Sequence, residues 1–313
     1  MAAWTTADIP DQHGVIAVVT GSNSGIGFIA ARELARAGAT TVMACRNAEK
    51  AADAEAKIRA DVPEADLTVL PLDLADLSSV RAFATDLGQR YDGLDLLVNN
   101  AGVMAIPHRT TKDGFEMQLG TNHLGHFALT GLLLDQLRTR EHPRVVTISS
   151  GAHRPGRINF DDLQSERRYS SWGAYMQSKL ANLLFMYELH RRTEASGLPL
   201  RSVAAHPGYA ATNLQFVAPQ MAGNRVMRAV SSGFMSIGNA VFSQSDEMGA
   251  LPTLYAATTP DLPGGSYVGP DGWMELRGHP TLVKSSSPTA RDPEVARRLW
   301  EVSEQLTDVH YKF

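Results

Sequence analysis

The stretch Thr20-Gly21-Ser22-Asn23-Ser24-Gly25-Ile26-Gly27 constrains the fold more than any other part of this sequence. It follows the apolar run 15–19 and precedes the alanine-rich segment 28–37, so we expect it to join a strand to a helix. Its three glycines let the backbone turn sharply and let a pyrophosphate approach bare amides at the helix N-terminus. The turn therefore favours a dinucleotide site, although similar turns occur in α/β proteins that bind nothing there.

Apolar runs and helical periods alternate along the chain. Strands joined by helices at this rhythm pair in parallel through right-handed crossovers. We therefore expect an α/β fold, with a doubly wound parallel sheet between two helix layers. A single domain should cover residues 1–313, with a substrate-covering segment at about 213–245. The expected strands span 15–19, 40–44, 67–72, 94–98, 144–148, 203–205 and 266–268. The expected helices span 28–37, 49–60, 78–87, 113–137, 172–193, 249–257 and 293–306.

Composition argues against several classes of protein. With 43% hydrophobic residues among 313, the chain can bury a substantial core. A net charge of −4 gives no reason to expect binding to nucleic acid or to an anionic membrane surface. The lone cysteine, Cys45, fits a reducing, cytoplasmic location. We expect no signal peptide in residues 1–14, and no membrane span, because no run of about 18 apolar residues occurs.

Polar or small residues stand where the predicted strands end. Gly21, Arg46, Asp73, Asn99 and Ser150 each lie at or just past the end of a strand. In an open parallel sheet the carboxyl ends of the strands meet at one edge, and ligands bind there. These residues are therefore expected to border one site.

Tyr175 and Lys179 are four residues apart, so they share one face of the predicted helix. A free tyrosine has a pKa near 10, and a nearby ammonium favours the phenolate, which suits acid–base chemistry. Ser150 is placed to donate a hydrogen bond to a substrate oxygen, and Asn122 to hold a water or a backbone kink. Each has an ordinary alternative, since such spacings arise by chance and serines often cap turns.

Taken together, these motifs resemble the classical short-chain dehydrogenase/reductase family over most of the chain, which implies a Rossmann fold. The motifs are Thr20-Gly21-x-x-x-Gly25-x-Gly27, Asp73, Asn99-Asn100-Ala101-Gly102, Asn122, Ser150, Tyr175-x-x-x-Lys179, Pro207-Gly208 and Thr212. The resemblance implies a catalytic tetrad of Asn122, Ser150, Tyr175 and Lys179, with Tyr175 as the general acid/base. It also implies a set of cofactor-binding residues, in which Lys179 binds the nicotinamide ribose and Thr212 the carboxamide. That set is Gly21, Ser22, Asn23, Ser24, Gly25, Ile26, Gly27, Arg46, Asp73, Leu74, Asn99, Ala101, Gly102, Tyr175, Lys179, Pro207, Gly208 and Thr212.

More narrowly, the chain is similar to the retinol-dehydrogenase-like branch. The segments 121–127 and 174–182 carry this likeness, as does the insertion of 24 residues between Ser150 and Tyr175. Ser150 is preferred to Ser149 because the second serine of the pair usually polarises the substrate in this family. Relatives commonly assemble through the helices that bear Asn122 and Tyr175, so a homodimer or homotetramer is expected.

Arg46 decides the expected cofactor. A carboxylate at the end of the second strand accepts ribose hydroxyls from NAD, whereas a cation there pairs with the 2′-phosphate of NADP. Arg46 therefore favours NADP(H) over NAD(H), the alternative being a solvated surface arginine. No metal is expected: His123 and His126 are three residues apart, but no third ligand is evident.

The expected activity is hydride transfer between NADP(H) and the carbonyl or alcohol of an apolar small molecule such as an aldehyde, a ketone or a retinoid-like or steroid-like compound. The apolar preference rests on the methionine and aromatic residues of segment 216–242, which also suit core packing or a subunit interface. Two other classes are considered. A non-catalytic dinucleotide sensor has no need of Tyr175 with Lys179. A sugar-nucleotide epimerase or dehydratase usually carries a differently spaced glycine motif and a larger C-terminal domain.

Overall fold

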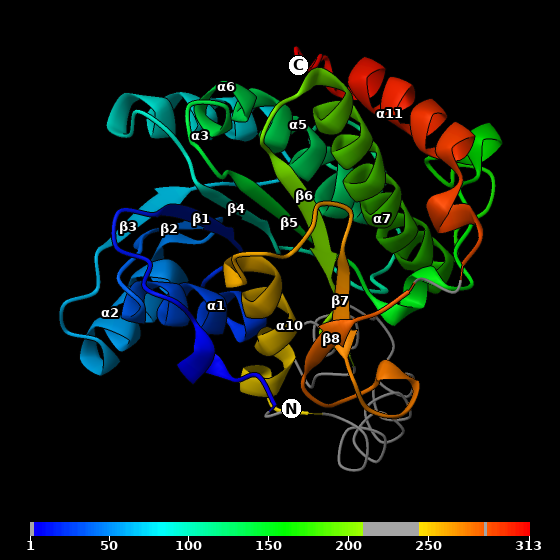
Figure 1. Ribbon diagram of the computed structural model, residues 1–313. Helices are drawn as coiled ribbons and strands as arrows, with labels where there is room; N and C mark the ends of the chain where they lie inside the picture. Colours follow the sequence, from blue (N-terminus) through cyan, green and yellow to red (C-terminus); the bar gives the residue numbers. More distant parts are fainter. Residues whose placement is uncertain (1–2, 209–243, 285–286) are drawn as a thin grey trace, which may run out of the picture.

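An eight-stranded sheet organises the computed structural model, which describes residues 3–208, 244–284 and 287–313 (Figure 1). The strand order is β3-β2-β1-β4-β5-β6-β7-β8, with every pair parallel except β7 with β8. The strands are β1 (Ile16–Thr20), β2 (Thr40–Cys45), β3 (Leu67–Pro71), β4 (Leu96–Asn99), β5 (Arg144–Ile148), β6 (Arg201–Ala205), β7 (Tyr267–Pro270) and β8 (Pro280–Leu282). Since β1 lies between β2 and β4, the order reverses there, which opens a crevice at the carboxyl ends of the strands.

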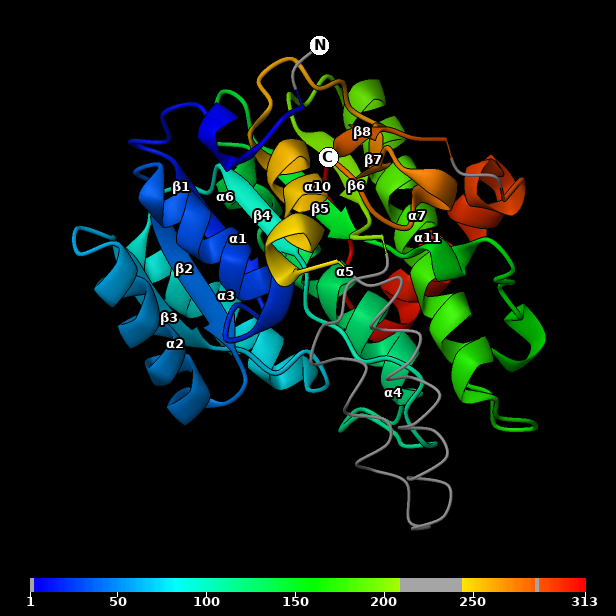
Figure 2. The same cartoon turned by 90° about the horizontal axis from the view of Figure 1, so that it is seen from below.

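Helices cover both faces of the sheet and complete three layers. Ala17 and Val19 of β1 pack in a core with α1 and α10, whereas Val18, on the opposite face, packs with α3 and α5. Figure 2 shows α1 and α10 side by side. The first layer contains α1 (Gly25–Arg36), α2 (Ala48–Asp61) and α10 (Asp246–Thr258). The second contains α3 (Leu77–Arg90), α5 (Gly125–Leu132), α6 (Leu134–Leu137), α7 (Ser171–Ser196) and α11 (Pro293–Thr307).

The predicted doubly wound α/β fold is therefore confirmed. Both faces of the central strands are buried, which explains why they appear in the sequence as short, continuous apolar runs. Within the described ranges, no helix has the length and apolarity that crossing a bilayer requires.

The long helix predicted over 113–137 is interrupted. It consists of α4 (Met117–Leu119), a π-helical turn η2 (Gly120–Leu124), α5 and α6. The π turn is wider than an α-helical turn and includes Asn122. A second interruption lies between α5 and α6, where Leu133 has a non-helical ψ of 1°. Residue periodicity cannot distinguish a π turn from the α-helix around it, because both keep the same side of the chain buried.

The sheet also has one more strand than predicted. The expected last strand at 266–268 corresponds to β7, but β8 follows it and closes the edge in the antiparallel sense. β8 has only three residues and begins with a proline, so it carries no alternating pattern. Thr212 and the predicted substrate-covering segment at about 213–245 lie outside the described residues, apart from Gln244 and Ser245.

Candidate active site

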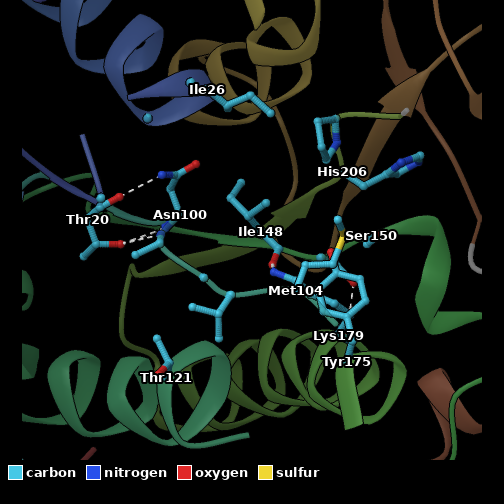
Figure 3. A pocket seen from close by; sticks show the side chains of 18 of the residues that line it. Thr20, Ile26, Asn100, Met104, Thr121, Ile148, Ser150, Tyr175, Lys179 and His206 are labelled. Carbon is cyan, nitrogen blue, oxygen red and sulfur yellow. Dashed lines mark hydrogen bonds between the residues drawn. The ribbon is translucent and has the colours of Figure 1, made fainter. Parts of the chain in front are cut away.

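A cavity of about 590 Å³ opens where the carboxyl ends of the strands meet. Figure 3 shows Thr20 and Asn100 on one side of it and Ser150, Tyr175 and Lys179 on the other. Most of the residues predicted from the sequence line this cavity. They are Gly21, Asn23, Ser24, Gly25, Ile26, Gly27, Arg46, Asp73, Leu74, Ala101, Gly102, Ser150, Tyr175, Lys179, Pro207 and Gly208. The strand ends therefore bring together residues that are up to 187 positions apart, from Gly21 to Gly208.

Two predicted residues have side chains that point away from the cavity. The Ser22 hydroxyl is buried 3.3 Å from Cys45 Sγ, and Asn99 Nδ2 donates to Thr130 Oγ1 at 2.9 Å. Asn100, the next residue, lines the cavity in place of Asn99, because successive side chains of extended chain point to opposite sides. The side chains of Ser22 and Asn99 therefore hold the wall of the site together and are not available to a ligand in the cavity.

The glycine turn after β1 has no room for larger residues. A Cβ on Gly21 would lie 2.9 Å from Ala101 Cβ, and a Cβ on Gly27 would lie 2.5 Å from the Gly21 carbonyl oxygen. Gly21 also has a φ of +67°, which favours glycine. The N-cap of α1, Ser24, makes no side-chain capping bond, so the first amides of α1 remain free to bind an anion at the cavity.

Asn122 joins the loop after β4 to helix α7. Its Oδ1 accepts from the Val103 amide at 2.8 Å, and its Nδ2 donates to the Val103 carbonyl and to Ser178 Oγ, both at 2.9 Å. Ser178 precedes Lys179 on α7. The buried Asn122 therefore lies behind the cavity and fixes the positions of Gly102, Val103 and Lys179. The backbone kink expected at this residue is the π turn.

His126 connects the π turn to the glycine turn through hydrogen bonds whose directions can be deduced. Its Nδ1 lies 3.0 Å from the Asn122 carbonyl oxygen, which can only accept, so Nδ1 carries the proton. Its Nε2 lies 2.9 Å from Thr20 Oγ1 and must then accept from that hydroxyl. Thr20 Oγ1 in turn accepts from the amides of Asn100 and Ala101, both at 2.9 Å. A neutral His126 thereby takes the hydroxyl proton of Thr20 at a shorter distance than the Val98 carbonyl, which lies 3.3 Å from the same hydroxyl.

Acidification should lower the free energy of unfolding through the buried histidines of this region. Burial, the largest cause, lowers the pKa of His126 to about 4 and that of His123 to about 3. The unfolded chain therefore binds more protons than the folded one below the ordinary histidine pKa of about 6.5. The contribution of these two histidines to the free energy of unfolding should be complete above that pH. It should decrease on acidification toward about pH 4, by up to about 1.4 kcal/mol per pH unit for each histidine.

Urea unfolding between about pH 7 and pH 5 measures this slope. His126→Gln, which does not titrate, should reduce the slope by roughly the contribution of one proton. His142→Gln is the matched control, because it makes the same substitution at a side chain that is 73% exposed and lies outside this buried region. Equal slopes for the wild type and His126→Gln would contradict the burial of a neutral His126.

Ser149 and Ser150 follow β5 and face opposite ways. Ser149 is buried, and its hydroxyl donates to the Lys179 carbonyl at 2.8 Å. Ser150 lines the cavity, and its Oγ accepts from the Ala152 amide at 3.2 Å, which leaves its hydroxyl proton for Tyr175 or for a ligand in the cavity. The serine selected by the family resemblance is thus the one whose hydroxyl lies in the cavity.

Tyr175 and Lys179 lie at the start of α7, where Ser170 caps the helix by accepting from the Gly173 amide at 3.3 Å. Lys179 Nζ donates to the Ile148 carbonyl at 3.1 Å and lies 5.8 Å from the centre of the Tyr175 ring. Both side chains are buried, and both border the cavity. The helical spacing therefore brings the two groups together, as predicted from their separation of four residues.

Burial controls the ionisation of the pair. It raises the pKa of Tyr175 to about 12, although hydrogen bonding to Ser150 works in the opposite direction. Burial also lowers the pKa of Lys179 to about 8. The sequence suggested that the ammonium would favour the phenolate, but desolvation of the phenolate is the larger effect here. At neutral pH Tyr175 is consequently a phenol that carries a proton to donate.

Arg46 and Asp73 border the end of the cavity near α1. Arg46 directly follows β2, is exposed, and makes no ion pair with any described residue. Asp73 Oδ1 accepts from the Ala75 amide at 3.0 Å, and the Asp73 amide donates to Ser79 Oγ at 3.0 Å, so this turn is fixed by its own bonds. Arg46 therefore offers an uncommitted positive charge at the cavity, whereas Asp73 mainly shapes the wall.

Neither His123 in the π turn nor His126 in α5 is available as a metal ligand. His123 Nε2 lies 2.9 Å from Ser303 Oγ on α11, and both ring nitrogens of His126 are used as described above. The described part of the chain contains no group of three or more His, Cys, Asp or Glu residues arranged to hold a metal ion.

Comparison with known proteins assigns the family. The family model described as short chain dehydrogenase matches residues 15–222. Human retinol dehydrogenase 13 is 42% identical over 312 residues, which covers 97% of this chain and 87% of that protein. The chain therefore belongs to the short-chain dehydrogenase/reductase family. Within that family it falls in the retinol-dehydrogenase-like branch, as its motifs suggested.

Solved structures agree with this assignment. A crystal structure described as a putative uncharacterized protein from Mycobacterium paratuberculosis is 47% identical, with a TM-score of 0.81 and 100% of both chains covered. A Pseudomonas aeruginosa structure described as an RhlG/NADP active-site complex is 27% identical, with a TM-score of 0.63, over 84% of this chain and 97% of that one.

The sequence did not indicate most residues at the end of the cavity beyond Ser150 and Tyr175. Most of them come from loops that follow β4, β5, β6 and β7, where no periodicity guides assignment, and Trp172 lies in the first turn of α7. They are Met104, Arg154, Trp172, His206, Met274, Glu275 and Leu276. Only His206 carried a usable signal, since it directly precedes the Pro207-Gly208 motif.

Proposed function

We propose that this protein is an oxidoreductase that transfers a hydride between NADP(H) and the carbonyl or alcohol group of an apolar small molecule. One observation carries the proposal: Ser150, Tyr175 and Lys179 border the same cavity as the glycine turn after β1. A ligand that spans this cavity has its anionic part at the N-terminus of α1 and its far end beside Tyr175. A dinucleotide has these proportions and this charge distribution.

The residues around the cavity fit such a cofactor. The free amides of α1 would hold the pyrophosphate, and Lys179 would hold the nicotinamide ribose. A Cβ on Gly102 would lie 3.0 Å from Asn122 Oδ1 and 3.6 Å from Lys179 Nζ, so glycine at this position avoids a tight contact with Asn122 beside the amine. When bound, NADPH would supply the hydride.

The protein's own residues would then handle the proton and the charge on oxygen. Ser150 Oγ and Tyr175 Oη would donate hydrogen bonds to the substrate carbonyl oxygen, which polarises the carbonyl bond. Tyr175 would give its proton to the substrate oxygen as negative charge develops there, and the nearby Lys179 ammonium would stabilise the phenolate that remains. Alcohol oxidation runs these steps in reverse.

Two further features support the proposed cofactor and the proposed apolar substrate. The uncommitted charge of Arg46 favours NADP(H) over NAD(H), since it can pair with the 2′-phosphate, and the similar Pseudomonas aeruginosa structure is described as an NADP complex. Met104, Trp172, Met274 and Leu276 give the substrate end an apolar wall, which favours an apolar substrate. Self-association and a cytoplasmic location stay predictions from the family resemblance and composition.

NADPH absorbance, followed against a panel of aldehydes, ketones, quinones, steroids and retinoids, tests the proposal. We expect turnover of apolar carbonyl compounds with NADPH, and slower turnover at the same concentration of NADH. Dinucleotide binding without turnover of any member, in either direction, would instead support a non-catalytic sensor. The absence of dinucleotide binding would contradict the assignment of the cavity.

A further inference from the structure

The turn that follows β7 holds two consecutive residues in an unfavourable backbone conformation. Met274 has a φ of +52° and Glu275 a φ of +58°, and neither is a glycine. Residues other than glycine keep this left-handed conformation only when surrounding contacts hold them, and such residues gather at functional sites. Both residues border the substrate end of the cavity. The contacts that hold this turn, residues 273–276, therefore bear on the shape of the site.

Backbone bonds close the turn itself, from the Glu275 amide to the Gly272 carbonyl at 2.9 Å and from the Leu276 amide to the Trp273 carbonyl at 3.1 Å. One carboxylate oxygen ties the closed turn to two other loops. Glu275 Oε2 accepts from Arg154 Nη2 at 2.7 Å and lies 2.9 Å from Nε2 of the buried His206. His206 Nδ1 accepts from the Gly208 amide at 3.2 Å, so its proton is on Nε2 and is donated to Glu275. Burial alone would raise the pKa of Glu275, but the His206 hydrogen bond and the neighbouring positive charge lower it overall, so the carboxylate is ionised.

This carboxylate links the loops that follow three neighbouring strands. Arg154 comes four residues after Ser150 in the loop after β5, and His206 directly follows β6. Glu275 itself follows β7. The fit between the last two loops is tight, since a Cβ on Gly208 would lie 2.5 Å from the Leu276 carbonyl oxygen. Glu275 thus fixes the 273–276 turn relative to both Ser150 and the Pro207-Gly208 motif.

The turn presents apolar side chains to the cavity. Met274 and Leu276 both line it, and the side chain of Met274 remains 58% exposed. An accessible methionine beside a cavity is suited to contact an irregular apolar ligand. Neither side chain can carry out proton transfer, so the turn can affect which substrate binds but not the chemical step itself.

We propose that Glu275 is a positioning residue that sets substrate specificity, by holding Met274 and Leu276 as the wall against the apolar body of the substrate. The inference rests on the proposed function, because it needs a carbonyl compound bound at Ser150 and Tyr175. A substrate with a long hydrocarbon chain touches this wall, whereas a short one reaches the reacting groups without it. Replacement of Glu275 should therefore raise KM more for long substrates than for short ones.

A series of straight-chain aldehydes from propanal to decanal tests this inference with NADPH. Glu275→Gln should raise KM for the longest aldehydes roughly tenfold, while KM for the shortest, kcat and the Kd for NADPH change by less than about twofold. Met274→Ala, which leaves the ionic contacts intact, should give the same dependence on length. In the double variant the two effects should not add, because both act through the same wall.

Glu301→Gln is the matched control, since Glu301 lies on the surface of α11, 51% exposed, and within the described ranges its ion-pair partner is Arg297. It should behave as the wild type for every aldehyde. A wild type that turns over neither this series nor any member of the wider panel would overturn the proposed function, and this inference with it. An active wild type, with Glu275→Gln and Met274→Ala changing all aldehydes equally or additively, would overturn this inference alone.

Discussion

The Tyr175→Phe variant should reduce its carbonyl substrate about a thousandfold more slowly than the wild type and bind NADPH with a nearly unchanged Kd. The substitution removes only the Oη atom and the proton it donates, while the buried ring and its packing beside Lys179 remain. Proton transfer by a positioned side chain typically contributes a factor of about a hundred to ten thousand. Single-turnover kinetics and a fluorescence titration with NADPH measure the two quantities separately.

Tyr187→Phe is the matched control for this variant. It changes the same atoms on the same helix, three turns further along α7, and Tyr187 does not line the cavity. It should keep both kcat and the Kd for NADPH. Retention of activity by Tyr175→Phe would refute the acid/base role, and loss of NADPH binding by it would show that the phenol mainly supports the cofactor.

The ionisation of the pair suits carbonyl reduction. Because burial raises the pKa of Tyr175 to about 12, the phenol holds its proton across the neutral range and can donate it as charge develops on the substrate oxygen. Oxidation of an alcohol needs the phenolate instead, whose formation depends on the charge of Lys179. Burial lowers the pKa of Lys179 to about 8, so that charge weakens above this pH. Reduction therefore needs Tyr175 in its protonated form, whereas oxidation needs it deprotonated.

The sequence predicted the sheet well because its central strands are buried on both faces. Runs such as 15–19 and 144–148 are continuous apolar segments bounded by small or polar residues, and each became a strand at nearly the predicted bounds. A backbone kink was one of the two roles expected for Asn122, but neither its form as a π turn nor the short edge strand β8 was predicted. Neither changes the local apolar pattern. The π turn is linked through His126 to Thr20, far away in the chain, whereas β8 is a three-residue strand paired with the nearby β7.

The place of the site could be predicted more securely than the direction of each side chain. Motifs located Asn99-Asn100 and Ser149-Ser150 at strand ends, but adjacent residues there point to opposite sides. The family resemblance chose Ser150, which lies in the cavity, and also chose Asn99, whose side chain faces Thr130. Glu275 carried no sequence signal at all, since its role depends on two loops that meet only in the folded chain.

The Arg46→Asp variant should bind NADPH roughly a hundredfold more weakly while its Kd for NADH changes little or improves. Arg46 directly follows β2, lines the cavity, and makes no ion pair with another described residue, so its guanidinium is free for the 2′-phosphate. Hydrogen bonds to charged groups each contribute about 1.5–3 kcal/mol, and about 2.7 kcal/mol corresponds to a hundredfold. The introduced carboxylate repels the phosphate but can accept hydrogen bonds from the ribose hydroxyls of NADH.

Calorimetric titration of both dinucleotides with Lys57→Asp separates this local effect from a general change in charge. Lys57 lies exposed on α2 and does not line the cavity, so the variant alters the net charge by the same amount without touching the proposed phosphate site. It should weaken NADPH binding only slightly, and less at higher salt, because distant exposed charges are screened. Equal losses of affinity for NADPH and NADH in Arg46→Asp would mean that Arg46 does not bind the 2′-phosphate. Any preference between the two cofactors would then have to arise elsewhere in the site.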